Sequence, residues 1–183
     1  NGTLKLYFDD DVKFNKTPNA TLTISSRGIK EITATIGANV NVTTPLTVDD
    51  EVELRATTGA VIDMKNLNCE KAEIGITTGA KVNIENLICE GTLDLGATTG
   101  SEISIVKATS KRLEAGVTTG ASITVAAGSV GKVDLDATTS GTIKVAADIT
   151  GGEATATTAS KIRTHVEKLN EMTSTTGGKV KDL

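Results

Sequence analysis

The chain has 183 residues, a formal net charge of -4, and only three aromatic residues, one Tyr and two Phe. The negative charge disfavours a nucleic-acid partner, because the phosphate backbone attracts basic proteins. No run of eighteen apolar residues is present, so the sequence predicts no membrane-spanning helix. A core with so few aromatic side chains has to be built from small and β-branched residues, which suits a narrow coil better than a broad sandwich.

The first thirty residues differ in pattern from the rest of the chain. Residues 4–8 and 21–24 are predicted to be strands, separated by three aspartates at 9–11 and by a turn at Pro18. We interpret residues 1–30 as N-terminal strands that either cap the following repeat region or continue a sheet from an upstream part of the protein.

A Thr-Thr-Gly turn, or a near copy of it, recurs seven times within residues 31–183. Successive threonine pairs start 20, 21, 20, 20, 19 and 18 residues apart. Such a regular period indicates one structural unit stacked repeatedly along an axis. The pairs begin at Thr57, Thr77, Thr98, Thr118, Thr138, Thr157 and Thr175.

Alternation within each repeat predicts strands on both sides of the turn. Between residues 113 and 125 every second residue is small or apolar, apart from Thr119, and neighbouring repeats keep the same phase. A degenerate repeat at residues 32–42 has Ile36 and Gly37 at its turn, and short third strands are expected near residues 67–69 and 87–89. We therefore predict an all-β protein, a single-stranded parallel β-helix (β-solenoid), with about eight rungs of about 20 residues over 31–183.

The same phase makes a prediction for the interior of the coil. It places the second threonine of each pair inside, where a buried hydroxyl needs a hydrogen-bond partner, so Thr99→Val or Thr119→Val would lower stability. The third turn position, occupied by Ser140 and Ala159 in two repeats, is expected to need little room or a positive φ. The threonines predicted to be interior are Thr58, Thr78, Thr99, Thr119, Thr139, Thr158 and Thr176. A second interior column is predicted at Ala56, Ile76, Ala97, Val117 and Ala137.

The repeat pattern resembles a known family. The strand before each corner reads acidic-apolar-x-small and the strand after it reads x-apolar-x-apolar, with Thr-Thr-Gly where that family has Ser-Gly-Ser-Gly. In these features the chain resembles, over nearly its whole length, the head GIN domain family of auto-transporter adhesin domains. Its opening, Asn-Gly-Thr-Leu-Lys-Leu, looks like the middle of the family's domain. The resemblance implies an exported β-helical protein of the cell surface or periplasm, and it carries no catalytic residues.

An acidic residue stands four positions before each threonine pair. Each precedes an inward residue, so these carboxylates are predicted to form an outward column, the acidic ladder, with neighbours about 5 Å apart. Repulsion would raise some of their pKa values and a calcium ion would relieve it. The alternative is a solvated face that keeps the rod soluble. With its degenerate first member, the ladder comprises Glu31, Glu53, Glu73, Asp94, Glu114, Asp134, Glu153 and Glu171. The candidate metal ligands are Glu53, Glu73, Asp94, Glu114 and Asp134; no loop shaped to wrap calcium is evident, so at most a weak, nonspecific site is expected.

Basic residues gather near the C-terminal end of the chain. They lie four or six positions after their threonine pairs and are predicted to face outward on the second strand of the last rungs. They are a candidate site for anionic glycans or for end-to-side association between rods, or else a scattered set of exposed charges. This basic cluster comprises Lys144, Lys161, Arg163, Lys179 and Lys181.

Few residues of the chain are suited to redox, metal or nucleophilic chemistry. Cys69 and Cys89 each follow a threonine pair at the same spacing, so they are expected to stack in adjacent rungs as free buried thiols or as a disulfide. His165 is the only histidine, which excludes a histidine metal cluster and a Ser-His-Asp triad. No cofactor is predicted.

The sequence favours a binding or scaffolding role. The rungs are uniform and lack long inserted loops, where functional sites usually lie. We predict a non-catalytic extracytoplasmic adhesion or scaffold module, with glycans or other surface proteins as partners and with homo-oligomer formation through the coil ends. The alternative is a polysaccharide-binding or polysaccharide-degrading β-helix protein that uses carboxylates of the ladder. The absence of Trp, and of any aromatic residue in the repeats, weighs against that alternative.

Overall fold

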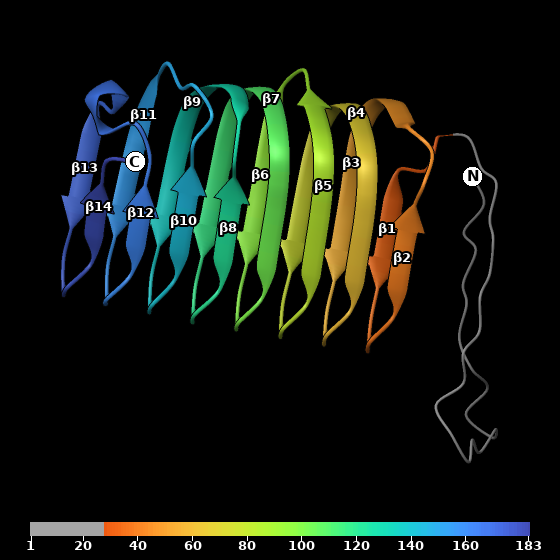
Figure 1. Cartoon of the computed structure of the whole chain (residues 1–183), viewed down its shortest axis with the longest axis horizontal. Coiled ribbons are helices and arrows are strands. Elements are labelled where there is room, and N and C mark those ends of the chain that lie inside the picture. Colours follow the sequence, from red (N-terminus) through yellow and green to blue (C-terminus); the bar gives the residue numbers. More distant parts are fainter. Residues whose placement is uncertain (1–27) are drawn as a thin grey trace, which may run out of the picture.

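The computed structural model describes residues 28–183, which form one continuous coil of parallel strands (Figure 1). The predicted β-solenoid with rungs of about 20 residues is confirmed. The strands expected at residues 4–8 and 21–24 lie outside the described part of the chain. The strands are β1 (Glu31–Ala34), β2 (Asn39–Val42), β3 (Leu46–Ala56), β4 (Val61–Ile76), β5 (Lys81–Cys89), β6 (Thr92–Ala97), β7 (Glu102–Val117), β8 (Ser122–Val125), β9 (Gly128–Ala137), β10 (Thr142–Val145), β11 (Gly151–Ala156), β12 (Lys161–Arg163), β13 (Glu171–Ser174) and β14 (Lys179–Lys181).

Each rung contributes a strand before its Thr-Thr-Gly turn and a strand after it. The strands before the turns stack in register into one layer, the pre-turn layer, as in the pairing of Leu93 with Leu113 and of Leu95 with Ala115. The strands after the turns stack into a second, post-turn layer, which includes β5, β8, β10, β12 and β14. The sixteen-residue strands β4 and β7 belong to both layers, because they continue around the wide corner opposite the turns. At that corner the predicted third strand pairs Leu67 with Leu87.

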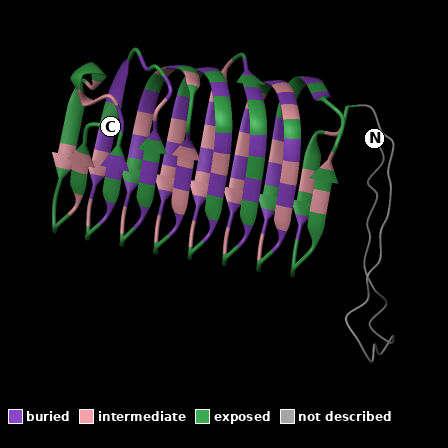
Figure 2. Ribbon diagram, viewed as in Figure 1, coloured by how far each residue is buried: buried purple, intermediate pink, exposed green. Residues whose placement is uncertain are grey.

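The core lies between the two layers and is made almost wholly of aliphatic side chains. Strand burial alternates strictly in most rungs, and Figure 2 shows this as bands across the ribbon. The predicted interior column is confirmed, because all five of its residues are at most 1 % exposed: Ala56, Ile76, Ala97, Val117 and Ala137.

The turn threonines correct one of the sequence predictions. Thr119 is exposed with φ +48°, and Gly120 has φ +72°. Ala121 N–H donates to the carbonyl of Thr118 at 3.1 Å. Two successive positive φ angles closed by such a bond make a type I′ turn, which reverses the chain within two residues. The second threonine therefore lies at the tip, and the prediction that it is interior was wrong.

The same correction holds for every repeat. The second threonines have φ between 44° and 50° and are exposed, and Ile36 of the degenerate rung has φ +49° and is 81 % exposed. The loss predicted for Thr99→Val therefore cannot come from a buried hydroxyl. The positive φ expected at the third turn position is confirmed at Ser140 and Ala159, which have φ +64° and +61°.

The turns also bind one another along the coil. Gly59 N–H donates to the carbonyl of Thr78 at 3.0 Å, and Gly79 N–H donates to Thr99 at 3.1 Å. Ala159 N–H makes the equivalent bond to Thr176 at 3.1 Å, so the alanine keeps the turn geometry at the cost of a left-handed backbone. Each turn is therefore hydrogen-bonded to the turn of the next rung, just as the strands of neighbouring rungs are. The turns form a straight edge along the rod, which we call the turn edge.

The last two rungs keep the strand phase despite weakly helical periodicity in their sequence. Ile162 and Thr164 are fully buried, as the strand phase predicts. A single turn of 3-10 helix, η1 (Val166–Lys168), occupies the wide corner before β13. The expected cover over this last rung, from a neighbouring molecule or from downstream residues, stays a prediction.

We expect Ala159→Gly to raise the free energy of unfolding by about 1 kcal/mol. Glycine accepts a positive φ that alanine adopts only with strain, and the exposed methyl group makes little packing contact. Urea unfolding followed by circular dichroism measures the change. The control is Ala127→Gly, another exposed alanine but without a positive φ, which should lower stability through backbone entropy. Equal effects of the two substitutions would contradict the proposed strain.

Candidate functional site

The acidic ladder is one unbroken column on the outer surface of the pre-turn layer. Strand register pairs Glu31 with Glu53, and so on through the last rung, where Glu153 pairs with Glu171. The side chains point outward, as predicted, and are partly or fully exposed. Parallel strands are about 4.8 Å apart, so each carboxylate between the two ends of the column faces like charges on both sides.

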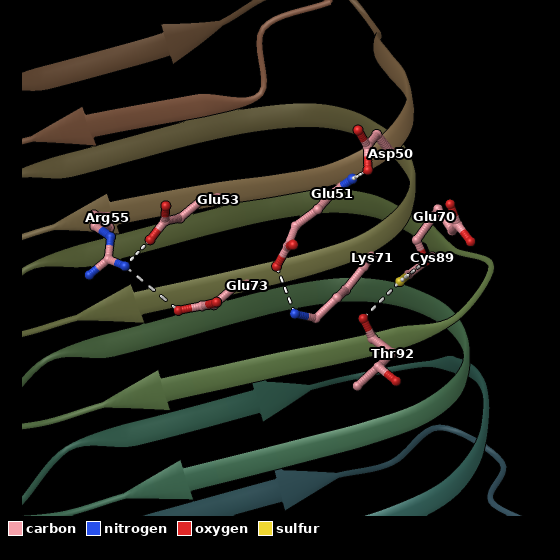
Figure 3. Close-up of polar contacts among 9 residues, drawn as sticks. All are labelled: Asp50, Glu51, Glu53, Arg55, Glu70, Lys71, Glu73, Cys89 and Thr92. Atoms are coloured by element: carbon pink, nitrogen blue, oxygen red, sulfur yellow. Dashed lines mark hydrogen bonds and ion pairs between the residues drawn. The ribbon is translucent and has the colours of Figure 1, made fainter.

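Arginines beside the ladder offset part of this repulsion. Arg55 forms an ion pair with Glu53 and lies 3.7 Å from Glu73 (Figure 3). Arg112 Nε donates to Glu114 at 2.6 Å, and its terminal nitrogen lies 3.5 Å from Asp134. Each arginine therefore spans two neighbouring rungs of the ladder.

A lysine flanks the same face. Lys71 Nζ donates to Glu51 at 2.7 Å, and this hydrogen bond together with the charge of Glu51 raises the pKa of Lys71 (Figure 3). Arg55, Lys71 and Arg112 were not included in the predicted site. Each stands two residues from a ladder carboxylate, and this even spacing was the signal that could have identified them.

Asp94 occupies the middle of the ladder between the two arginine-bridged pairs. Its pKa is raised, first because partial burial disfavours the charged carboxylate and then because Glu114 and Glu73 repel it. The positive charge of Lys71 lowers the pKa of Asp94 and so offsets part of this shift. The raised pKa predicted within the ladder is thus confirmed at Asp94, although the largest single cause is desolvation by burial and not repulsion by a neighbouring carboxylate.

The ladder geometry does not resemble a tight calcium site. Its carboxylates stand side by side on a flat strand surface, and within residues 28–183 no three His, Cys, Asp or Glu side chains converge as metal ligands would. Calcium usually requires six to eight oxygens around one point. Cation binding by the ladder therefore stays a proposal, of a weak and nonspecific kind.

The basic cluster lies on the post-turn layer, as predicted. Thr142, Lys161 and Lys179 form one column of paired residues, and Lys144, Arg163 and Lys181 form the next. All five cationic side chains are exposed, and among residues 28–183 none forms an ion pair. The structure thus brings the cluster together on one face and leaves its ligand open.

The two cysteines are stacked in register at the wide corner. Both are buried free thiols. Cys89 Sγ lies 3.1 Å from the carbonyls of Glu70 and Thr92, which can accept its proton (Figure 3). The hydrogen bond with Cys89 and burial raise the pKa of Cys69. A protonated buried thiol is a poor nucleophile, which favours a packing role for Cys69.

Open hollows are present on the outer surface of the coil, including one on the post-turn layer and one at the wide corner. The larger, about 310 Å³, follows a polar column of the post-turn layer that includes Asn41, Asp63, Asn83 and Ser104. Asn83 Nδ2 donates to Asp63 at 2.8 Å, so one of the carboxylates that line this hollow is hydrogen-bonded to an amide. The smaller, about 190 Å³, lies beside Cys69 at the wide corner. Both are shallow depressions between rungs of the coil.

Comparison with known proteins supports the resemblance over part of the chain. Residues 1–85 match the model of the family described as "Putative auto-transporter adhesin, head GIN domain". The resemblance inferred from the repeats is thereby confirmed for these residues. The searches of curated proteins and of solved structures gave no match. Within residues 28–183, no helix has the length and apolar character needed to cross a membrane.

We expect Asp94→Asn to stabilise the protein at neutral pH by less than about 1 kcal/mol, because partly exposed charges are screened by solvent. A carboxyl whose folded-state pKa is raised favours folding more as the pH falls, until it is protonated in both states near its ordinary value of 3.8. The variant should therefore lose stabilisation relative to the wild type between pH 7 and pH 4. Urea unfolding at several pH values measures this, with Asp136→Asn as control, since Gly116 and Thr155 flank Asp136. A pH profile identical to wild type would contradict the assignment.

We expect calcium to bind the ladder weakly or not at all. Isothermal titration should give no binding tighter than about millimolar, the range of weak extracellular sites, because the carboxylates supply few converging oxygens. Binding in the micromolar range that is lost in Asp94→Asn and Glu114→Gln would overturn this prediction and favour calcium-dependent adhesion.

Proposed function

We propose that this protein is a non-catalytic extracytoplasmic adhesion module that contacts surface glycans or proteins through its repeated polar surface. The observation that carries the proposal is the turn edge, where each threonine pair lies at the rim of the coil and the second threonine is exposed. Hydroxyl groups both donate and accept hydrogen bonds, as sugar hydroxyls do. A straight edge of such groups suits an extended polar partner better than a small ligand.

The distribution of charged groups supports binding over catalysis. General acid–base chemistry needs groups that meet at one reacting atom, usually within hydrogen-bond reach of it. Here the carboxylates form a flat column, and His165 lies 4.0 Å from Glu167 at the wide corner of a late rung. The adhesin description of the matching family supports the same role and an extracytoplasmic location.

The alternative is a polysaccharide-binding or polysaccharide-degrading protein. The larger hollow favours it, because Asp63 and Glu85 are both among its lining residues. Cleavage requires one of two such carboxyls to act as an acid and the other as a base or nucleophile. The hydrogen bond between Asp63 and Asn83 supports a structural role for that aspartate.

A panel of neutral and anionic glycans, scored for both binding and release of reducing ends, tests the proposal. We expect binding without cleavage, and a loss of at least about tenfold in affinity when Thr78, Thr99 and Thr119 are all changed to Gly, because each lost hydrogen bond contributes about 1 kcal/mol. Glycine fits the positive φ at these positions, so the turns should survive.

The matched control changes the same three threonines to Ser, which keeps the hydroxyls and should keep most of the binding. Product release that is abolished by Asp63→Asn would instead establish the degrading alternative. Absence of binding both to the glycan panel and to intact cell surfaces would overturn the adhesion proposal.

A further inference from the structure

The last three rungs carry opposite charges on their two faces. The outer side chains of β10, β12 and β14 include five cations and no carboxylate; we call this set, Lys144, Lys161, Arg163, Lys179 and Lys181, the basic face. Its charges stack directly, Lys144 on Arg163 and Arg163 on Lys181. Like charges at this spacing repel one another, so the face is electrostatically unsatisfied.

The pre-turn layer of the same rungs carries the opposite sign. Its outer surface on β9, β11 and β13 holds four carboxylates, Asp134, Asp136, Glu153 and Glu171, which we call the acidic face. Lys132 is the one cation on these strands, and Asp134 lies 3.5 Å from Arg112 of the preceding rung. Among residues 28–183, neither Glu153 nor Glu171 forms an ion pair.

The two faces cannot neutralise each other within one molecule. Leu135 and Ala154 point inward from the acidic face, Ile143 and Ile162 point inward from the basic face, and all four are buried. An apolar core therefore separates the two sets of charges. Stacked sheets are about 10 Å apart, and the charged side chains extend away from the core on either side. The coil is thus polarised across its thickness at this end.

We propose that a second copy of this chain is the partner of these faces, with its basic face against the acidic face of the first. Both surfaces repeat at the strand spacing, so one translation across the coil brings cations opposite carboxylates in consecutive rungs. The contact is heterologous and leaves a free face on each outer copy, so it extends into lateral stacks instead of closing as a dimer. This inference goes beyond the adhesion role and does not depend on it.

A second copy fits better than an unrelated polyanion because this chain supplies both complementary surfaces with equal spacing. Exposed ion pairs are individually weak, so the association should be weak and strongly dependent on salt. It should also be sensitive to reversal of either face, whereas a polyanion would depend on the basic face alone.

Sedimentation velocity of the full chain at about 10 mM and about 1 M salt tests the proposal, since the screening length falls from about 30 Å to about 3 Å. We expect concentration-dependent species larger than the monomer at low salt and monomer at high salt. Lys161→Glu with Arg163→Glu should be monomeric at both, and so should Glu153→Lys with Glu171→Lys. An equimolar mixture of these two variants should associate again at low salt, because the first variant keeps the native acidic face and the second keeps the native basic face.

The control variant Lys107→Glu with Lys111→Glu makes the same change in net charge as Lys161→Glu with Arg163→Glu, but at exposed positions of the wide corner, and it should associate like the wild type. Circular dichroism confirms that each variant keeps its strands. Three results would overturn the proposal: a monomeric wild type at low salt, face variants that associate normally, or a mixture that stays monomeric. Binding of polygalacturonate by a monomeric wild type, lost only on reversal of the basic face, would identify a polyanion as the partner instead.

Discussion

Parallel stacking in register is the constraint on which every other feature of this structure depends. Backbone groups of each rung bond to the rungs above and below, at the strands and again at the turns, where Gly100 donates to Thr119 and Gly120 to Thr139. Because the register does not slip between most rungs, a residue's neighbours along the axis are the residues with the same role in the adjacent repeats. Interior columns are therefore largely apolar, whereas the outward carboxylates of the ladder are stacked on other carboxylates. The same bonds that stabilise the coil thus create the repulsion within the acidic ladder.

The sequence was sufficient to predict the coil but not the path of its turns. A period of about twenty residues and strict alternation identified the rungs, the layers and the buried column containing Ala97 and Val117. The position of the second threonine was predicted wrongly because parity does not detect the turn. Val117 and Ala121 are four residues apart and both buried, and Thr119 between them shares their parity whether the chain continues as a strand or reverses in a type I′ turn. The positive φ angles show that Thr119 lies at the tip of the turn, and threonine is not a residue that usually indicates a positive φ.

Prediction of the candidate site was limited for a related reason. The spacing of four residues before each threonine pair placed the ladder on one outer face, and the even spacing of the cations grouped the basic cluster on another. Parity does not say how far a flexible side chain reaches, so the bridging of Glu53 and Glu73 by Arg55 required the structure. Partial burial as the leading cause of the raised pKa of Asp94 also depends on how neighbouring side chains cover it. The opposition of basic and acidic faces became evident only with the two-layer cross-section.

A coil of short uniform rungs favours extended contacts over convergent chemistry. Groups that must meet at one atom usually come from loops, and the reversals here use two residues each, leaving the wide corner as the only longer connection among residues 28–183.

A coil of this kind can instead change the residue types along one column of its surface from rung to rung. One column of the post-turn layer changes from amides and a carboxylate through hydroxyls to cations, in the order Asn41, Asp63, Asn83, Ser104, Thr124, Lys144, Arg163 and Lys181. Neighbouring positions in this column differ little in geometry, so a partner lying along it would be distinguished by its sequence of charges and hydrogen-bonding groups. Specificity in this protein would then depend on position along the rod, which is the form of recognition expected of a surface that binds polymers or other rods.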